Sequence, residues 1–205
     1  ENEIQNLFNE SNKVSNETGS FTDSRDGKTY KTVKIGNQWW MAENLAYLPS
    51  VYPSSSGSNT EARYYVQGYQ DSDVAIAKQQ ANYTNLGVLY NWAAAKSACP
   101  PGWHLPTDVE WKQLEIVLGM TQSQADASGY RGPEQEIQLK SISGWSNNRN
   151  GNNLSGFNAI PTGDRSDNGT FNSSVHTTFW TNTEYSSSES WWRDLHSNYA
   201  GIARN

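Results

Sequence analysis

The chain has 205 residues, of which 35% are apolar and 12% aromatic, including nine Trp and eleven Tyr. This length favours one domain, and the aromatic residues compensate for the low apolar fraction because each one buries a large area. The net charge of −6 argues against nucleic acid or an anionic membrane as a partner, and no segment approaches the roughly 18 apolar residues of a membrane-spanning helix.

The first twenty residues are polar except for Ile4, Leu7 and Phe8. Such composition is typical of a segment that connects a domain to something else. We therefore interpret residues 1–20 as a tether or linker and expect the folded domain to occupy residues 21–205.

The first predicted element is a β-hairpin. Tyr30–Ile35 alternates with period two, Gly36-Asn37 follows, and Gln38–Met41 is a second extended run. Gly and Asn tolerate the positive φ of tight hairpin turns, so the pair predicts the turn. Neighbouring strand residues point to opposite faces, so at least one of Trp39 and Trp40 is expected in the core.

The next segment is irregular in composition. Residues 49–60 are rich in Ser, Pro and Gly and read as a loop. Glu61–Gln70 is rich in Tyr and predicts a short strand. Asp71–Gln80 fits either a helical turn or an insertion, and the residues do not decide between them.

Two consecutive helices follow. The first is predicted from residue 88 to the Cys99–Gly102 corner, where proline ends it. Thr107 and Glu110 have the spacing of a capping box and predict the start of the second, with Gly119 as its C-cap. The predicted apolar stripe of the first helix is Val88, Leu89, Trp92, Ala93 and Lys96, and that of the second is Trp111, Leu114, Val117 and Leu118.

The last third of the chain is predicted to hold long loops and a closing sheet. Residues 120–175 are polar and show little periodicity, which is typical of functional loops. Thr178–Tyr185 and Trp191–Leu195 read as a hairpin, and Tyr199–Arg204 as a further strand. Alternation along this hairpin favours burial of Trp180 and Trp192.

Several segments together carry a resemblance to a known family. They are Asp26–Tyr30, Ile35–Leu45, Gly87–Ala95, Cys99–Thr107, Glu110-Trp111, Gly156–Ala159 and Phe179–Glu184. In these segments the chain resembles the Fibrobacter succinogenes major paralogous domain, a family of bacterial surface and secreted proteins. The resemblance implies an α+β fold of C-type-lectin-like architecture, with an N-terminal β-hairpin, two helices, a long loop region and a closing antiparallel sheet. It also implies a secreted or cell-surface location.

Cys99 is the only cysteine in the sequence, and the family resemblance implies a disulfide partner for it. In the family, a strand that ends in cysteine follows a segment like Arg204-Asn205, and its cysteine would face the one equivalent to Cys99. We therefore expect the chain to be truncated at its C-terminus. The alternative is that Cys99 is a buried free thiol, which is common and inert.

The residues give little support for catalysis or for a cofactor. The family motif explains Cys99 and His104, and the three histidines have no metal-ligand spacing. We therefore expect no enzyme activity and no cofactor. Calcium remains possible, because Asp164–Gly169 resembles the start of a calcium-binding loop. The loop pattern is incomplete, since Val175 occupies the position of the bidentate Glu. The alternative to a calcium site is an ordinary Asx-rich turn.

Aromatic and arginine residues near the C-terminus predict a binding surface, since these residue types dominate interface hot spots and aromatic faces suit sugar rings. We expect a non-catalytic recognition module for a protein or glycan ligand, presented by loops 145–175 and strands 180–204. The alternatives are a structural subunit of a bacterial surface assembly and a cell-wall glycan hydrolase that uses Glu184, Glu189 or Asp194. The expected ligand-binding residues are Trp145, Arg149, Asp164, Tyr185, Trp191, Arg193, His196 and Tyr199.

Overall fold

The computed structural model describes residues 17–172, 174–186 and 189–205, which form a mixed α+β fold. Within this part of the chain the strands make three antiparallel sheets, β1-β2-β3, β4-β5 and β6-β9-β8-β7. In chain order the elements are β1 (Thr18–Thr22), β2 (Thr29–Ile35), β3 (Gln38–Met41), β4 (Tyr64–Tyr65), α2 (Val74–Ala77), α3 (Ala81–Leu86), β5 (Leu89–Tyr90), α4 (Trp92–Ala98), α5 (Asp108–Val117), α6 (Gln122–Asp126), β6 (Gly129–Arg131), α7 (Pro133–Leu139), β7 (His176–Glu184), β8 (Ser190–His196) and β9 (Ile202–Arg204).

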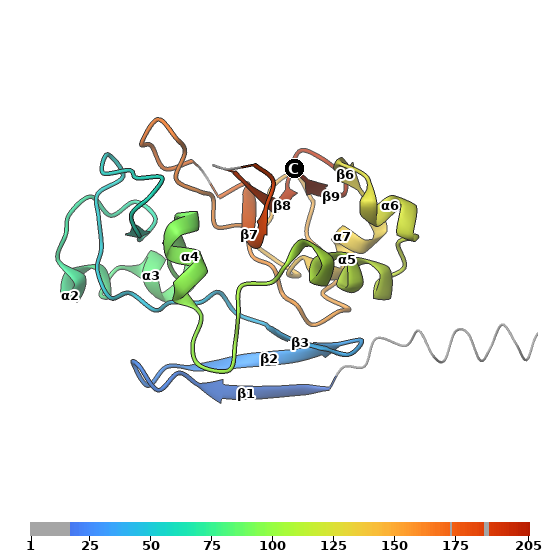
Figure 1. The fold of residues 1–205 in the computed structure, drawn as a ribbon, viewed down its shortest axis with the longest axis horizontal. Helices are drawn as coiled ribbons and strands as arrows, with labels where there is room; N and C mark the ends of the chain where they lie inside the picture. Colours follow the sequence, from blue (N-terminus) through green and yellow to red (C-terminus); the bar gives the residue numbers. More distant parts are fainter. Residues whose placement is uncertain (1–16, 173, 187–188) are drawn as a thin grey trace, which may run out of the picture.

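Two apolar clusters divide the molecule into two lobes. Figure 1 shows β7 and β8 in the middle, with α2, α3 and α4 on one side, α5, α6 and α7 on the other, and the sheet of β1, β2 and β3 along one edge. One cluster joins β2, β3, α5 and the closing sheet, and the other lies within residues 46–94. We call residues 44–98 the smaller lobe and the remaining described residues the larger lobe.

The predicted N-terminal hairpin is present as β2 and β3. Its turn places Gly36 at a φ of +60°, and a Cβ at that position would lie 2.8 Å from Cγ2 of Val117. Glycine is required there both by conformation and by space. Trp40 is buried in the larger core, whereas Trp39 is 42% exposed, so the prediction that at least one of them enters the core is confirmed.

The folded part begins before the predicted boundary at residue 21. Strand β1 starts at Thr18 and pairs with β2 in antiparallel register. Ladder hydrogen bonds, which do not depend on the polarity of the side chains, hold this segment in the sheet. Residues 1–16, the rest of the predicted linker, lie outside the described residues.

The smaller lobe is built from short elements. Residues 49–60 form a loop as predicted, and β4 lies in the segment predicted as a short strand. Asp73 caps α2 by accepting hydrogen bonds from the amides of Ala75 and Ile76, which decides for a helical turn in 71–80. All of these elements pack around a second apolar cluster, separate from that of the larger lobe.

The first long helix begins later than predicted. Residues Leu89 and Tyr90 pair with β4, and the Asn91 side chain then caps α4. The predicted apolar stripe is therefore wrong, because Val88 and Leu89 precede the helix and Lys96 is exposed. The buried side chains of α4 are Ala94, Ala95 and Ala98.

Helix α5 has the predicted start and end. The Thr107 side chain accepts from the Glu110 amide, and the Glu110 carboxylate accepts from the Thr107 amide. At the other end, the amides of Gly119 and Met120 donate to Ile116 and Glu115 in the pattern of a Schellman motif. Trp111, Leu114 and Leu118 are buried.

Residues 120–175 contain more regular structure than predicted. A second capping box, formed by Thr121 and Gln124, begins α6. Gly132 adopts a left-handed conformation before Pro133, which is the first residue of α7. These helices are too short to show helical periodicity, so the prediction of loops missed them, and their cap residues were the available signal.

The closing sheet confirms the predicted C-terminal hairpin, which is formed by β7 and β8. The predicted third strand is present as β9, between β6 and β8. None of the helices in the described part of the chain has both the length and the apolarity needed to cross a bilayer.

Candidate functional site

A cleft with a volume of about 1900 Å³ lies between the two lobes. Its lining comes from β3, from residues 86–92 of the smaller lobe and from both strands of the β7–β8 hairpin, with further residues between 98 and 111 and between 157 and 169. Eight of the nine tryptophans line it, and only Trp145 does not; the eight are Trp39, Trp40, Trp92, Trp103, Trp111, Trp180, Trp191 and Trp192.

The closing sheet supplies one side of this cleft. Trp180 of β7 and Trp192 of β8 are directly opposite each other in the register. Phe179, the neighbour of Trp180, points the other way and packs against Trp111 with ring centroids 5.5 Å apart. The prediction that Trp180 and Trp192 are buried is therefore wrong, because both are only partly buried and line the cleft.

Two indole groups join the lobes beside the cleft. The Trp180 Nε1–H donates to the carbonyl oxygen of Tyr90 at 2.8 Å, and the Trp92 Nε1–H donates to that of Thr181 at 3.0 Å. The bonds run in opposite directions between β7 and the start of α4, so each lobe anchors a tryptophan of the other.

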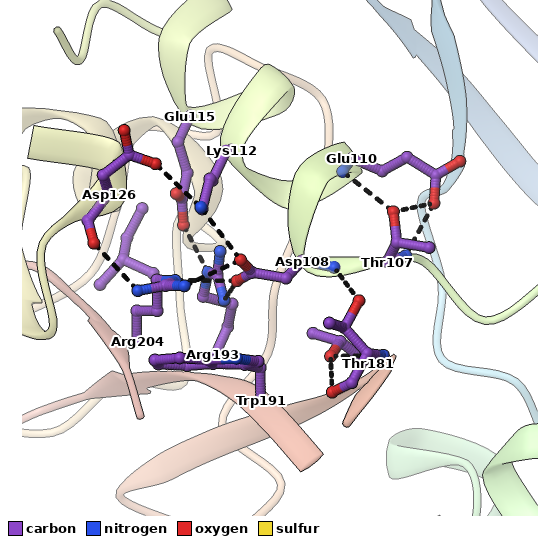
Figure 2. A network of polar contacts seen from close by, with 12 residues as sticks. Thr107, Asp108, Glu110, Lys112, Glu115, Asp126, Thr181, Trp191, Arg193 and Arg204 are labelled. Atoms are coloured by element: carbon purple, nitrogen blue, oxygen red, sulfur yellow. Dashed lines mark hydrogen bonds and ion pairs between the residues drawn. The ribbon is translucent and has the colours of Figure 1, made fainter. Parts of the chain in front are cut away.

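The end of the β7–β8 hairpin carries a second aromatic pair. Tyr185 is 61% exposed, and its ring meets the Trp191 ring edge-on, with centroids 4.8 Å apart. The Arg204 guanidinium lies 3.6 Å from the centroid of the Trp191 ring. This contact connects the aromatic pair to the buried charges of the larger lobe, as Figure 2 shows.

The buried charges form a network between α5 and the closing sheet (Figure 2). Arg193 of β8 reaches Glu115 at 2.7 Å and Asp108 at 2.9 Å. Arg204 donates to both Asp108 oxygens, at 2.8 and 2.9 Å. Burial alone would raise the pKa of Asp108, but the hydrogen bonds from Arg204 and the charge of Arg193 outweigh it and hold that pKa well below its usual range.

Two residues predicted to bind ligand are buried instead. Arg193 has no exposed surface, because it belongs to this network. Trp145 is 5% exposed, and its indole N–H donates to the Ser141 hydroxyl and the Ala159 carbonyl oxygen. Neither side chain is accessible to a ligand. Both are buried by tertiary contacts, which the amino-acid composition does not reveal.

Four other predicted residues meet at a second surface on the closing sheet. There the rings of His176, His196, Tyr199 and Tyr130 follow one another with centroids 5.4, 5.0 and 4.9 Å apart. We call His176, His196, Tyr199 and Tyr130 the ring row, although only two of them were predicted as site residues. Predicted site residues at this surface are His196 and Tyr199 within the row, Asp164 beside His176 at 3.4 Å, and Arg149, which donates to the Tyr199 carbonyl oxygen at 2.9 Å.

The two stacked histidines differ in acidity. The hydrogen bond to Asp164 raises the pKa of His176 against the effect of burial. Burial lowers the pKa of His196, and the charge on His176 lowers it further. As the pH falls, His176 is therefore protonated before His196.

The segment predicted as a calcium loop folds as a small hairpin. Asp164 accepts from the Asn172 side chain at 2.6 Å and pairs with His176. The Ser166 hydroxyl donates to the Asn168 side chain at 2.5 Å, and Gly169 has a φ of +82°. These oxygens already have partners, as in the Asx-rich turn, and within the described residues no group of three or more His, Cys, Asp or Glu side chains could hold a metal ion.

The carboxylates considered for hydrolysis do not face one another as a set. Glu184 is opposite Ser190, whereas Asp194 is opposite Thr178. Six residues of strand separate Thr178 from Glu184, which corresponds to about 20 Å. Asp194 is also buried and accepts a hydrogen bond from the Tyr130 hydroxyl at 2.8 Å.

Cys99 lies at the corner after α4 and lines the cleft as a partly buried, unpaired thiol. Burial raises the pKa of this thiol, which lowers its reactivity. The partner cysteine that the family resemblance implies for Cys99 stays a prediction.

Sequence reasoning missed most of the cleft. Trp39, Trp92 and Trp103 are far from the predicted surface in the chain, and only the fold brings them to the β7–β8 hairpin. The available signal was the number of tryptophans, which is high for a chain of this length. Tyr185, Trp191 and Asp164 were predicted and do line the cleft.

A comparison with protein-family models gives one match, to the Fibrobacter succinogenes major domain, over residues 33–203. Searches of curated proteins and of solved structures found no match. The matched range includes β3, the smaller lobe and the β7–β8 hairpin, and so it contains most of the residues that line the cleft. The chain belongs to the Fibrobacter succinogenes major domain family.

Proposed function

We propose that this protein is a non-catalytic recognition module of the bacterial cell surface or the secreted fraction, and that it binds a protein or glycan ligand in the cleft. The observation that carries the proposal is the gathering around one cleft of six tryptophans with exposed surface, beside the buried Trp40 and Trp111. Aromatic side chains combine a large apolar area with little conformational entropy to lose, which suits them to recognition.

The order of elements supports a C-type-lectin-like architecture within this proposal. An N-terminal hairpin, the helices α4 and α5, a long segment with short elements and a closing antiparallel sheet follow one another. In such an architecture the closing sheet and its loops commonly contact ligand, which is an argument from fold analogy. The cleft borders that sheet at Trp180 and Trp192.

The test is binding of the full chain to an array of surface glycans and of extended peptides. Tyr185→Ala and Trp39→Ala remove exposed cleft aromatics, and Tyr199→Ala removes an exposed aromatic of the ring row, which does not line the cleft. We expect both cleft variants to lose at least about tenfold in affinity, or about 1.4 kcal/mol, and Tyr199→Ala to bind like the parent.

Circular dichroism of each variant shows whether it has folded. Loss of binding in Tyr199→Ala alone would move the site to the ring row. Absence of any saturable ligand would contradict the recognition function itself. A parallel series with a chelator tests calcium, which we propose is not required.

A further inference from the structure

We propose that the ligand of the cleft is a cationic peptide segment, rich in Lys or Arg, of a partner protein. This inference rests on the proposed recognition function and narrows its ligand class. Two features of the cleft carry it, the sign of its charge and the use of its indole rings, and each favours a cation for a different physical reason.

The charged residues that line the cleft are mostly acidic. Five carboxylates line it, against one guanidinium and no lysine. The five are Glu43, Glu110, Asp164, Asp167 and Glu189. Two of them already contact a histidine, Glu110 at His104 and Asp164 at His176. A cleft of one charge sign between low-dielectric walls focuses the field and attracts ligands of opposite sign.

The single guanidinium in the lining is already engaged. Arg165 donates through Nε to the Ser54 carbonyl oxygen at 2.8 Å, and its guanidinium carbon lies 5.4 Å from the centroid of the Tyr65 ring. Its positive charge lies in the same loop as Asp164 and Asp167 and offsets part of theirs, so the lining as a whole stays acidic. Glu43, Asp167 and Glu189 are exposed, so their carboxylates are accessible to a ligand.

Indole rings of the cleft already hold cations of this chain. The Lys96 ammonium lies 3.9 Å from the centroid of the Trp92 ring, and the Arg204 guanidinium lies 3.6 Å from that of Trp191. Both tryptophans line the cleft. A ring face attracts a cation through its quadrupole. Because these two faces are occupied, a ligand cation would use other cleft rings with exposed surface, such as Trp39, Trp103 and Tyr185.

A peptide fits these features better than a sugar does. Carboxylates and indole faces both gain energy from an ammonium or guanidinium group, whereas a neutral sugar gains only from the rings. An extended chain can also contact several of the separate parts of the fold that line the cleft. Alternating cationic and small residues would place charges against the carboxylates while the backbone passes the tryptophans.

The experiment uses the full chain and three peptides of about twelve residues, which span up to about 40 Å when extended. One contains alternating Lys and Ser, the second has Gln in place of each Lys, and the third has Glu. A glucose oligomer is the neutral glycan probe. We expect the Lys peptide to bind saturably, the Gln and Glu peptides to bind at least about tenfold more weakly, and the difference to shrink between about 50 and 300 mM salt.

A matched pair of double variants separates the cleft from the net charge of the molecule. Asp167→Asn with Glu189→Gln removes two charges from the lining, and Asp71→Asn with Glu134→Gln removes two exposed charges elsewhere. We expect only the first pair to weaken the Lys peptide, by at least about tenfold, and Tyr185→Ala to weaken it without any change of charge.

The outcomes distinguish this inference from the function on which it rests. Equal weakening by the two double variants would show attraction to bulk charge and overturn the inference. Binding of the glucose oligomer but not of the Lys peptide, with loss in Tyr185→Ala, would overturn the cationic ligand and leave the recognition function standing. Failure of every probe and of the arrays above would contradict both.

Discussion

Glu115 accepts three charge-assisted hydrogen bonds in a place without solvent exposure. Arg131 donates to both of its carboxylate oxygens, at 2.8 and 2.7 Å, and Arg193 donates to one at 2.7 Å. Because one carboxylate serves two arginines from different strands, it joins α5 to β6 and β8. Removing the charge of Glu115 leaves the buried guanidinium groups of Arg131 and Arg193 with one negative charge fewer to balance them.

The first prediction concerns this carboxylate. Glu115→Gln keeps the shape of the side chain and removes the charge, so the free energy of unfolding should fall by about 3–5 kcal/mol. The control is Glu134→Gln on an exposed position of α7, which should change it by less than about 0.5 kcal/mol. Urea denaturation measures both, and similar values for the two variants would show that the network contributes no net stability.

The second prediction concerns the stacked histidines. The raised pKa of His176 means that its pairing with Asp164 contributes fully below the unfolded pKa of about 6.5 and is lost as pH rises through the folded value. The other groups that influence these rings are Asp194, Lys140 and Glu136. A double-mutant cycle of His176→Gln and Asp164→Asn removes their effects and isolates the pair.

We expect the coupling energy from this cycle to be larger at about pH 5.5 than at about pH 8, because only charged His176 pairs as an ion. Denaturation at each pH measures it. NMR titration of the two histidines provides an independent check, with His176 titrating above His196. A coupling energy that does not change with pH would mean that the contact is an uncharged hydrogen bond.

At the scale of elements, the β2–β3 turn depends on one glycine for two reasons. Gly36 has a φ of +60°, and its missing Cβ leaves room for Val117 at the end of α5. Gly27 has a comparable φ of +75°, but a Cβ there would meet nothing within 4 Å. The two positions therefore separate backbone strain from steric contact.

The third prediction uses this difference. Gly27→Ala should lower the free energy of unfolding by about 1 kcal/mol through strain alone. Gly36→Ala should cost about 1–3 kcal/mol more, because the new methyl group must displace Val117. Thermal or urea denaturation of the two variants is the measurement, and equal losses would show that Val117 adjusts without cost.

At the scale of the whole molecule, the two lobes have separate apolar cores that differ in size and composition. The cluster of the smaller lobe contains three alanines among its eight buried members, whereas that of the larger lobe contains three tryptophans and a phenylalanine. The cluster of the smaller lobe has eight buried members against fifteen, so this lobe is expected to open at a lower free energy. The reciprocal indole bonds of Trp92 and Trp180 oppose that opening.

The fourth prediction follows from these bonds. Trp92→Phe removes one link between the lobes and should increase amide hydrogen exchange in residues 44–98 more than elsewhere. Trp145→Phe removes a buried indole from the larger lobe and should instead increase exchange around α7 and residues 155–160. Uniform acceleration in both variants would show that the two lobes unfold as one unit.

Much of the local structure could be predicted because its causes lie within a few residues. The Gly36-Asn37 turn, the Thr107–Glu110 capping box and the end of α5 at Gly119 all follow from conformations and hydrogen bonds between near neighbours. The start of α4 was predicted too early because it depends on contacts with residues distant in the chain. Asn91 caps that helix while also accepting from the Arg63 amide, and no local pattern contains the β4–β5 pairing that places Leu89 and Tyr90 outside it.

The family, the α+β class, the hairpins and the corner between α4 and α5 could be predicted from the residues, since motifs and contacts between near neighbours specify them. Which aromatic and charged side chains reach the surface could not be predicted, because that depends on how distant segments pack. Arg193 and Trp145 are buried because partners that are distant in the chain or in the sheet enclose them, whereas Trp39 and Trp192 reach the cleft. Burial depends on contacts between residues that the chain brings together from far apart, and residue type alone does not contain that information.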